Sequence, residues 1–138
     1  MCIFCKIVKG EAPAFFIYEG ERLVSFLDKY PLYWGHSLIV PREHYQDLHD
    51  TPVELLQEMI ALAKYLAKAI VNVTGATGIK LLMNNGRDAG QEVFHVHLHV
   101  IPYGVKKMNR RELTKEEGEG LSAKLREQLK SILSDKGW

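Results

Sequence analysis

Residues 94–101 read F-H-V-H-L-H-V-I, with three histidines at every second position and an apolar residue in each gap. In an extended strand, a period of two puts His95, His97 and His99 on one face and the apolar residues on the other. Neighbouring imidazoles would be roughly 7 Å apart. Imidazole acts as nucleophile, proton carrier and metal ligand near neutral pH, so the row predicts chemistry. The alternative is a solvated strand face.

The chain has 138 residues, a mass of 15.8 kDa and a hydrophobic fraction of 46%. This size predicts one domain over residues 1–138, with a core over about 1–103 and a charged helical extension over about 104–138. The formal net charge of +1 creates no global field for nucleic acid or an anionic membrane. We therefore expect neither as a partner.

Two further features bear on location. The start, M-C-I-F-C-K, has no leader pattern, and no run of eighteen apolar residues occurs. We expect a soluble, cytoplasmic protein. The two cysteines, Cys2 and Cys5, are close in sequence, and in a reducing compartment such a pair is a thiol or metal-ligand pair rather than a structural disulfide.

The hydrophobic pattern predicts an α+β fold, with an antiparallel sheet of about five strands, a long helix on one face and a C-terminal helix. Thr51 is expected to cap the long helix, with Pro52 at its first position, and the helix should end before Thr74. The expected elements are a hairpin over 14–28, a strand over 37–40, the long helix from 52, strands over 79–83 and 94–101, and a helix from about 115.

The polar loop over 84–90 leads directly into the histidine row. Glycines 86 and 90 allow close backbone approach, and successive N–H groups in such a turn can form a concavity for phosphate oxygens. Asn84 and Gln91 can add amide donors. The alternative is a simple connection between two strands.

The segment G-Q-E-V-F-H-V-H-L-H-V-I-P resembles the signature of the histidine triad (HIT) nucleotide-binding family. The N-terminal C-I-F-C-K-I-V-K-G-E-A-P-A and the central G-H-S-L-I-V-P-R-E-H are similar to its Hint branch. The likeness runs from Cys2 to about Tyr103. It implies a HIT-like fold that pairs as a homodimer with a continuous sheet.

The resemblance also implies residue roles. His97 is the nucleophile, forming a nucleotidyl-histidine intermediate that water hydrolyses, while His99 and His36 lie beside the α-phosphate. The remaining substrate-binding positions divide by the group they contact: phosphate by Asn84, Gly90, Gln91 and the Val93 amide, the ribose hydroxyls by Asp28, and the base by Phe26, Leu27 and Ile39. From the residues alone, Asp28 equally starts a turn before Pro31.

One position departs from the branch. Many Hint-branch members carry Ser or Thr after the glutamine, where a hydroxyl donates toward the leaving group, but this chain carries Glu92. An ionised carboxylate cannot donate a hydrogen bond. The departure puts rate and leaving-group preference in doubt and leaves the nucleophile unaffected.

The Cys2-x-x-Cys5 pair is half of a tetrahedral zinc site. Family members with histidines at the places of His44 and His95 bind zinc structurally, so the resemblance implies these four residues as ligands. The alternative is two reduced cysteines near a chain end. The resemblance requires no metal for the chemistry.

The resemblance implies an enzyme that cleaves purine nucleoside phosphoramidates or related AMP or GMP conjugates to the nucleoside monophosphate. Two alternatives stay open: a dinucleoside polyphosphate hydrolase like the Fhit branch, and a nucleotide-binding regulatory module with incidental hydrolysis. The basic residues Lys106, Lys107, Arg110 and Arg111 can receive a phosphate or form a solvated face.

Overall fold

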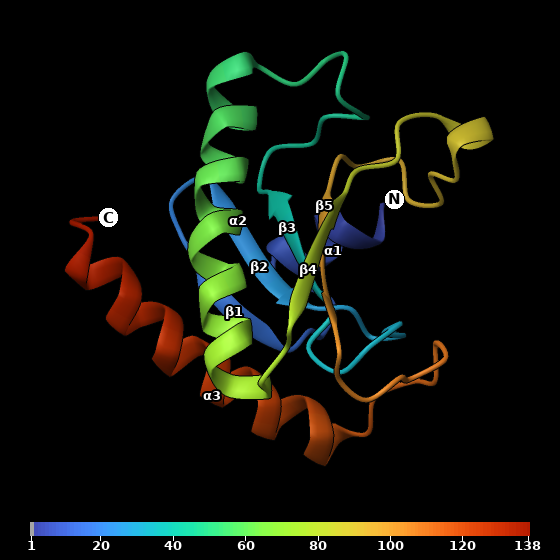
Figure 1. Ribbon diagram of the computed structural model, residues 1–138. Helices are drawn as coiled ribbons and strands as arrows, with labels where there is room; N and C mark the ends of the chain where they lie inside the picture. Colours follow the sequence, from blue (N-terminus) through green and yellow to red (C-terminus); the bar gives the residue numbers. More distant parts are fainter. Residues whose placement is uncertain (1) are drawn as a thin grey trace.

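The computed structural model describes residues 2–138, which form an α+β domain (Figure 1). Within this range a sheet has the strand order β1-β2-β3-β5-β4, and every neighbouring pair is antiparallel. The predicted fold class is therefore confirmed. The elements in chain order are α1 (Ile3–Val8), β1 (Phe16–Glu19), β2 (Leu23–Leu27), β3 (Ser37–Pro41), α2 (Val53–Thr74), β4 (Gly78–Leu82), a short 3₁₀ helix (Arg87–Ala89), β5 (Leu98–Tyr103) and α3 (Lys115–Asp135).

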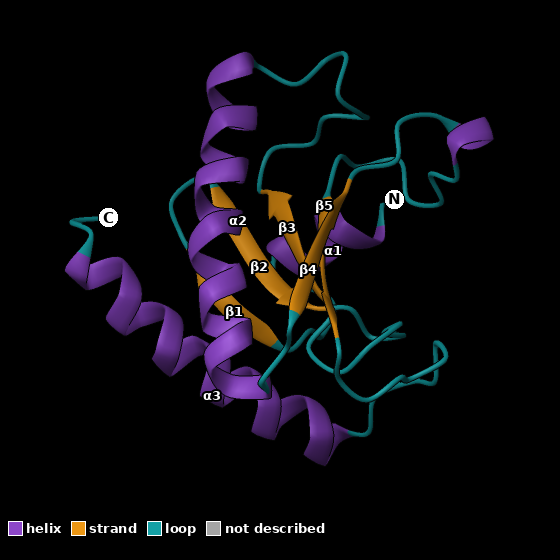
Figure 2. Cartoon of the chain, viewed as in Figure 1, coloured by secondary structure: helices purple, strands orange, loops and turns teal. Residues whose placement is uncertain are grey.

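Helices cover both faces of the central strands. On one face, α2 and α3 pack against alternate strand residues such as Leu27 and Ile39 to form the main core. On the other face, α1 packs through Phe4 and Ile7 against the intervening residues, such as Phe26. Figure 2 shows this arrangement, with α2 in front of the sheet, α3 crossing below the end of α2 and the short α1 behind the sheet. Because both faces are covered, β2 and β3 are buried along their whole length.

The long helix begins differently from the prediction. Pro52, with an extended backbone, is its N-cap, and its first residue is Val53. The Thr51 hydroxyl donates to the Asp47 carbonyl oxygen at 2.6 Å, so it is committed to the preceding loop. The predicted Thr51 cap is therefore wrong. At the other end the helix includes Thr74 and stops at Gly75, whose φ of 77° is left-handed.

The C-terminal helix starts at a capping box. Thr114 accepts from the Glu117 backbone N–H, and the Glu117 side chain accepts from the Thr114 backbone N–H. The apolar residues Leu121, Leu125 and Leu129 of α3 then enter the main core beside β1. Within the part of the chain that the structure describes, no helix is both long and apolar enough to cross a membrane.

The histidine segment is less extended than its pattern predicts. Strand β5 begins only at Leu98, so His95 and His97 precede it, but the three rings still lie on the α1 side: Phe4 contacts the His95 and His97 rings, and the His97 ring is next to that of His99. The backbone just before β5 bonds to another segment instead: the Val96 N–H donates to the Tyr45 carbonyl oxygen at 2.7 Å. The His97 and His99 ring centres lie 4.9 Å apart.

Candidate active site and metal centre

A cavity of about 1190 Å³ opens on the face covered by α1. Its walls come from α1, residues 12–16, the end of β2, the loop before β5 and the start of α3. Most of the predicted substrate-binding residues line it: Phe26, Leu27, Asp28, Asn84, Gly90, Val93, His97 and His99. The sheet and two connections thus bring together residues as far apart in sequence as Phe26 and His99.

Two predicted residues lie elsewhere. Ile39 is fully buried in the main core, on the face packed by α2, whereas its neighbour Leu38 lines the cavity. Because successive side chains of a strand point to opposite faces, only Leu38 can meet a ligand there. The assignment of Ile39 to the base does not fit the structure.

Gln91 is also committed elsewhere. Its amide nitrogen donates to the carbonyl oxygens of Gln46 at 2.7 Å and Val93 at 3.1 Å, and its amide oxygen accepts from the Gly86 N–H at 2.8 Å. It is 3% exposed and does not line the cavity. Gln91 therefore holds the loop rather than a phosphate.

The expected row of phosphate-binding loop amides is likewise mostly used within the loop. The N–H groups of Ala89, Gly90 and Gln91 donate to carbonyl oxygens of Arg87 or Gly86. Among the described residues, the Val93 amide has no such hydrogen-bond partner, and Val93 lines the cavity. This leaves the Val93 amide as a donor available to an oxyanion.

Hydrogen bonding fixes the proton position on His97. Its Nδ1 lies 2.7 Å from the backbone oxygen of His95, and a carbonyl oxygen can only accept. In the neutral ring, Nδ1 therefore carries the proton and Nε2 holds a free lone pair. Burial lowers the pKa of His97, and the bond to His95 only partly opposes this effect. His97 is thus neutral at pH 7 with an unprotonated nitrogen, as a nucleophile requires.

A second chain of contacts fixes His36 and His99. The Leu32 N–H donates to His36 Nδ1 at 3.1 Å, so the neutral His36 ring carries its proton on Nε2. This Nε2 lies 3.0 Å from His99 Nδ1, which must accept, leaving the His99 proton on its own Nε2. Burial is the main cause that lowers the pKa of His36 to about 3 and that of His99 to about 4. His36 is 1% exposed and acts on the cavity through His99.

Asp28 combines both roles considered for it. One carboxylate oxygen accepts from the Tyr30 N–H at 2.9 Å, which closes a turn. The other oxygen lies 3.5 Å from His36 Nε2, and the residue lines the cavity. Burial raises the pKa of Asp28, opposed by the Tyr30 hydrogen bond and the charge of Arg110. The turn therefore presents the carboxylate to the cavity.

The contribution of α1 to the cavity is not predicted by the sequence pattern. Ile3, Phe4 and Ile7 line the cavity, and the Phe4 ring meets the His97 ring edge-on with centres 5.0 Å apart. Their I-x-x-x-I spacing is helical, but a six-residue segment gives too short a pattern to separate from a strand.

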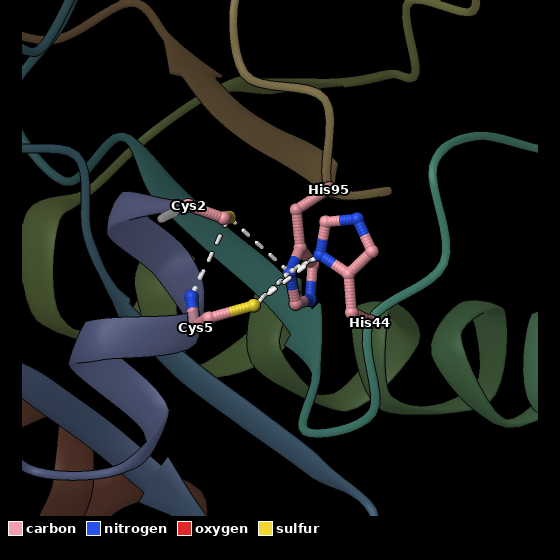
Figure 3. Close-up of side chains that lie close together, drawn as sticks. All are labelled: Cys2, Cys5, His44 and His95. Atoms are coloured by element: carbon pink, nitrogen blue, oxygen red, sulfur yellow. Dashed lines mark hydrogen bonds between the residues drawn. The ribbon is translucent and has the colours of Figure 1, made fainter.

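Four side chains converge beside this cavity, as Figure 3 shows. Cys2 and Cys5 come from α1 and its cap, His44 from the loop after β3, and His95 from the segment before β5. Cys5 Sγ lies 3.2 Å from His44 Nδ1 and 3.6 Å from His95 Nδ1, and the two nitrogens are 3.1 Å apart. Cys2 Sγ lies 3.5 Å from His95 Nδ1.

These spacings fit a tetrahedral zinc ion. Zinc bonds near 2.0 Å to nitrogen and 2.3 Å to sulfur place tetrahedral ligands about 3.3–3.8 Å apart. His95 Nε2 lies 2.8 Å from the Pro41 carbonyl oxygen, so its proton is there and its Nδ1 lone pair faces the cluster. Burial and the neighbouring Cys2 raise the pKa of Cys5, and a bound cation would reverse that effect.

Comparisons with known proteins agree with this geometry. The model of the HIT domain matches residues 9–104. Adenylylsulfatase HINT3 of Arabidopsis thaliana is 45% identical over 101 residues, covering 73% of this chain and 51% of that protein. Adenosine 5'-monophosphoramidase HNT1 of Saccharomyces cerevisiae is 48% identical over 101 residues, covering 73% and 61%. The chain thus spans about half to three fifths of these two relatives.

Solved structures match over nearly the whole chain. A hypothetical histidine triad nucleotide-binding protein from Sulfolobus tokodaii has a TM-score of 0.88 at 34% identity, covering 96% of this chain and 94% of that one. A zinc-bound histidine triad family protein from Mycobacterium smegmatis has a TM-score of 0.84 at 40% identity, covering 97% and 96%.

The fold, the arrangement of the histidines and the similarity to known proteins together define a histidine triad protein. The chain belongs to the HIT domain family, and the two relatives described above are of the Hint type. The predicted family is therefore confirmed, and the expectation of a hydrolase agrees with both names.

Proposed function

We propose that this chain is a nucleotidyl hydrolase that cleaves nucleoside phosphoramidates or related AMP or GMP conjugates to the nucleoside monophosphate. The observation that carries this proposal is the protonation of His97, whose Nδ1 proton is held by the His95 carbonyl oxygen at 2.7 Å. An imidazole held this way at a cavity wall offers Nε2 as a nucleophile. The two named relatives support the same kind of activity.

The proposed reaction has two steps. His97 Nε2 attacks the α-phosphorus, and the bond to the leaving nitrogen or oxygen breaks with its electron pair moving to that atom. His99, which carries its proton on Nε2, is placed to donate to the leaving atom. Water then attacks the same phosphorus and gives a proton to the vacated Nε2 of His99, while the phosphorus–nitrogen bond breaks with its electron pair returning to His97 Nε2, so that both histidines are restored.

The charge that develops on the phosphate needs donors. The Val93 amide and Asn84 line the cavity beside the imidazoles and supply them without a metal. Asp28 would accept from the two ribose hydroxyls, and the apolar wall of Phe4, Phe26 and Leu38 would hold the base.

Turnover of adenosine 5'-phosphoramidate, followed by chromatography of the released AMP, tests this proposal. We expect His97→Ala to lower kcat by at least about 10³-fold and to abolish a nucleotidyl adduct that mass spectrometry detects in acid-quenched wild type. Diadenosine polyphosphate turned over faster than the phosphoramidate would favour the dinucleoside polyphosphate hydrolase. Binding of AMP without turnover of either compound would favour a regulatory module. His97→Ala at wild-type rate would contradict the covalent route.

We also propose that Cys2, Cys5, His44 and His95 hold a structural zinc ion. The convergence of their ligand atoms supports this, as does the zinc-bound relative of Mycobacterium smegmatis. Bound zinc would tie together α1, the loop after β3 and the segment before β5. A reducing compartment such as the cytoplasm would keep both cysteines available.

A homodimer is the proposed assembly. Strand β4 ends the sheet order, so its outer edge has unpaired backbone groups that can extend a sheet. Its residues Leu81 and Leu82 are 43% and 38% exposed, and Ile60 of α2 is 55% exposed. A second copy paired at this edge would cover them.

A further inference from the structure

The connection between β5 and α3 lies side by side with the connection between β2 and β3, as Figure 1 shows below the sheet. Backbone hydrogen bonds of 2.9 Å join the two segments at four places: Trp34 to Lys106, Met108 to Leu32, Arg110 to Pro31, and Leu113 to Lys29. Since Asp28 and His36 bound the second segment, residues 106–113 are positioned against the wall of the proposed active site.

This pairing holds two residues in an unusual backbone conformation. Asn109 and Arg110 have φ of 53° and 57°, and they are the non-glycine residues with positive φ among those the structure describes. Left-handed backbone is uncommon for a side chain of arginine's size, and such strain concentrates at functional sites. The Arg110 N–H to Pro31 bond fixes the turn that brings Arg110 to the cavity.

Arg110 differs from the other basic side chains that line the cavity. Lys29 pairs with Glu112 at 3.5 Å, Lys115 with Glu119 at 3.9 Å, and Arg126 donates to the Phe16 carbonyl oxygen at 2.8 Å. No hydrogen bond or ion pair occupies the Arg110 side chain within residues 2–138. Its guanidinium is therefore free to bind a ligand.

The reacting end of the cavity needs such a cation. His36 and His99 have lowered pKa values, with burial as the main cause, so they carry no positive charge at pH 7. The Arg110 N–H donates to the Pro31 carbonyl oxygen, in the segment that ends at His36, and His36 Nε2 lies 3.0 Å from His99 Nδ1. This contact chain puts the Arg110 turn on the His99 side of the cavity, and the charge of Arg110 is among the causes that lower the pKa of His36 and of His99.

An in-line displacement places the leaving group opposite the nucleophile. We propose that Arg110 is a specificity-determining residue that binds an anionic group on the leaving part of the substrate, a sulfate, phosphate or carboxylate. The proposal rests on the hydrolase function above. It adds that the preferred conjugates have a charged rather than a neutral leaving group.

The chemistry of the side chain suits this role. A guanidinium presents parallel N–H donors that match two oxygens of a carboxylate, sulfate or phosphate, whereas lysine offers a single point charge. Glu92 also lines the cavity, and its charge helps to raise the pKa of Asp28, as that of Arg110 lowers it. Glu92 and Arg110 therefore bring opposite charges to the same region. We expect Glu92→Gln and Arg110→Gln to shift the preference for an anionic leaving group in opposite directions.

The test compares two substrates with the same nucleotide half. Adenosine 5'-phosphosulfate has an anionic leaving group, and adenosine 5'-phosphoramidate has a small neutral one. We expect Arg110→Gln to lower kcat/KM about 10- to 100-fold for the phosphosulfate, the range of one lost charged hydrogen-bonded contact, and less than about threefold for the phosphoramidate. Arg110→Lys should fall between, and Glu92→Gln should raise the phosphosulfate to phosphoramidate ratio.

Arg111→Gln is the matched control, because the Arg111 guanidinium pairs with Glu117 and does not line the cavity. It should leave the substrate ratio unchanged. Equal losses for both substrates in Arg110→Gln would assign Arg110 to the shared nucleotide half and overturn the proposal, as would no loss in either. Thermal unfolding of each variant checks that the turn still folds.

Failure of the proposed function gives a different result. If wild type hydrolyses neither compound, the hydrolase proposal is wrong, and calorimetric binding of the phosphosulfate and of AMP still decides the role of Arg110. Weakening of phosphosulfate binding alone in Arg110→Gln would support it. Equal weakening of both, or of neither, would overturn it.

Discussion

His97 Nδ1 donates to the backbone oxygen of His95 at 2.7 Å, while the His95 ring turns its own Nδ1 toward Cys2 and Cys5. One residue thus contacts the proposed nucleophile through its backbone and the cysteine cluster through its side chain. Any displacement of His95 also moves the carbonyl oxygen that accepts the hydrogen bond from His97 Nδ1. The two sites are mechanically linked at this residue.

This link predicts the effect of removing the metal. Wild type should contain about one zinc ion per chain by elemental analysis, and Cys5→Ser should contain much less. At free zinc 1,000-fold above its Kd, the ion would contribute about 4 kcal/mol to the free energy of unfolding. We expect Cys5→Ser to lose stability and also kcat, because His95 would no longer be held.

The control for the metal prediction is His49→Gln, since His49 is exposed and outside the cluster. It should keep both zinc and activity. A metal content near zero in wild type would rule out the zinc site.

His36 should act as a positioning residue for His99. His36→Ala removes the donor to His99 Nδ1 and frees the His99 ring to exchange its proton positions, so kcat should fall about 10- to 100-fold with little change in KM. His36→Gln retains an N–H donor near the position of Nε2 and should recover part of the rate. Equal activity of the two variants would show that the hydrogen bond does not matter.

Stability should fall as the pH falls from 7 toward 4. Unfolded histidines take up protons below about pH 6.5, whereas the folded pKa is about 3 for His36 and about 4 for His99. The unfolded state therefore binds more protons in this window, at a cost of at most about 1.4 kcal/mol per pH unit for each histidine. Asp28, with its raised pKa, acts in the opposite direction above about pH 4.

Urea unfolding at several pH values measures this slope. His36→Gln should flatten it, while the exposed His49→Gln should leave the slope unchanged. The same slope in wild type and His36→Gln would contradict a neutral buried His36.

Two glycines of α3 provide a matched pair. A Cβ on Gly118 would meet the Phe15 ring at 2.3 Å, whereas a Cβ on Gly120 would meet nothing within 4 Å. Gly118→Ala should lower the free energy of unfolding by about 1–3 kcal/mol, and Gly120→Ala should raise it by up to about 1 kcal/mol. Urea titration measures both effects, and a rise in the free energy of unfolding for both variants would show that Phe15 yields easily.

Assembly at the β4 edge predicts that a charge there separates the subunits. Leu81→Lys should shift the mass measured by light scattering from two chains to one at micromolar concentration. Leu48→Lys, at an exposed loop leucine outside the sheet, should keep the wild-type mass. A monomeric wild type would contradict the dimer.

The sequence predicted the elements whose patterns are long or alternate clearly. Both long helices and all the strands before the histidine segment lie within a few residues of their expected places. The boundaries failed where side chains bond to other segments. Thr51 looks like a cap, yet its hydroxyl bonds to Asp47, and the period of two over 94–97 describes alternating contacts rather than a paired strand.

The site was predictable in its polar residues and less so in its apolar wall. Histidines and Asp28 are singled out by their chemistry and by family resemblance, but which of Leu38 and Ile39 meets the cavity depends on which face α1 covers. Because α1 has six residues, its pattern could not fix that face. The sequence does not single out Arg110 from its basic neighbours, because its position depends on a turn held by backbone hydrogen bonds to residues far away in the sequence.

The central strands of this protein contribute side chains both to the cavity and to the main core. Phe26 and Leu38 shape the cavity, while their neighbours Leu27, which also borders the cavity, and Ile39 pack the main core one residue away. A substitution that reshapes the pocket from the strands therefore also disturbs the packing of α2. Variation in substrate choice among such chains should accumulate in α1, in the loop before β5 and in the connection to α3, where a side chain can change without repacking the sheet.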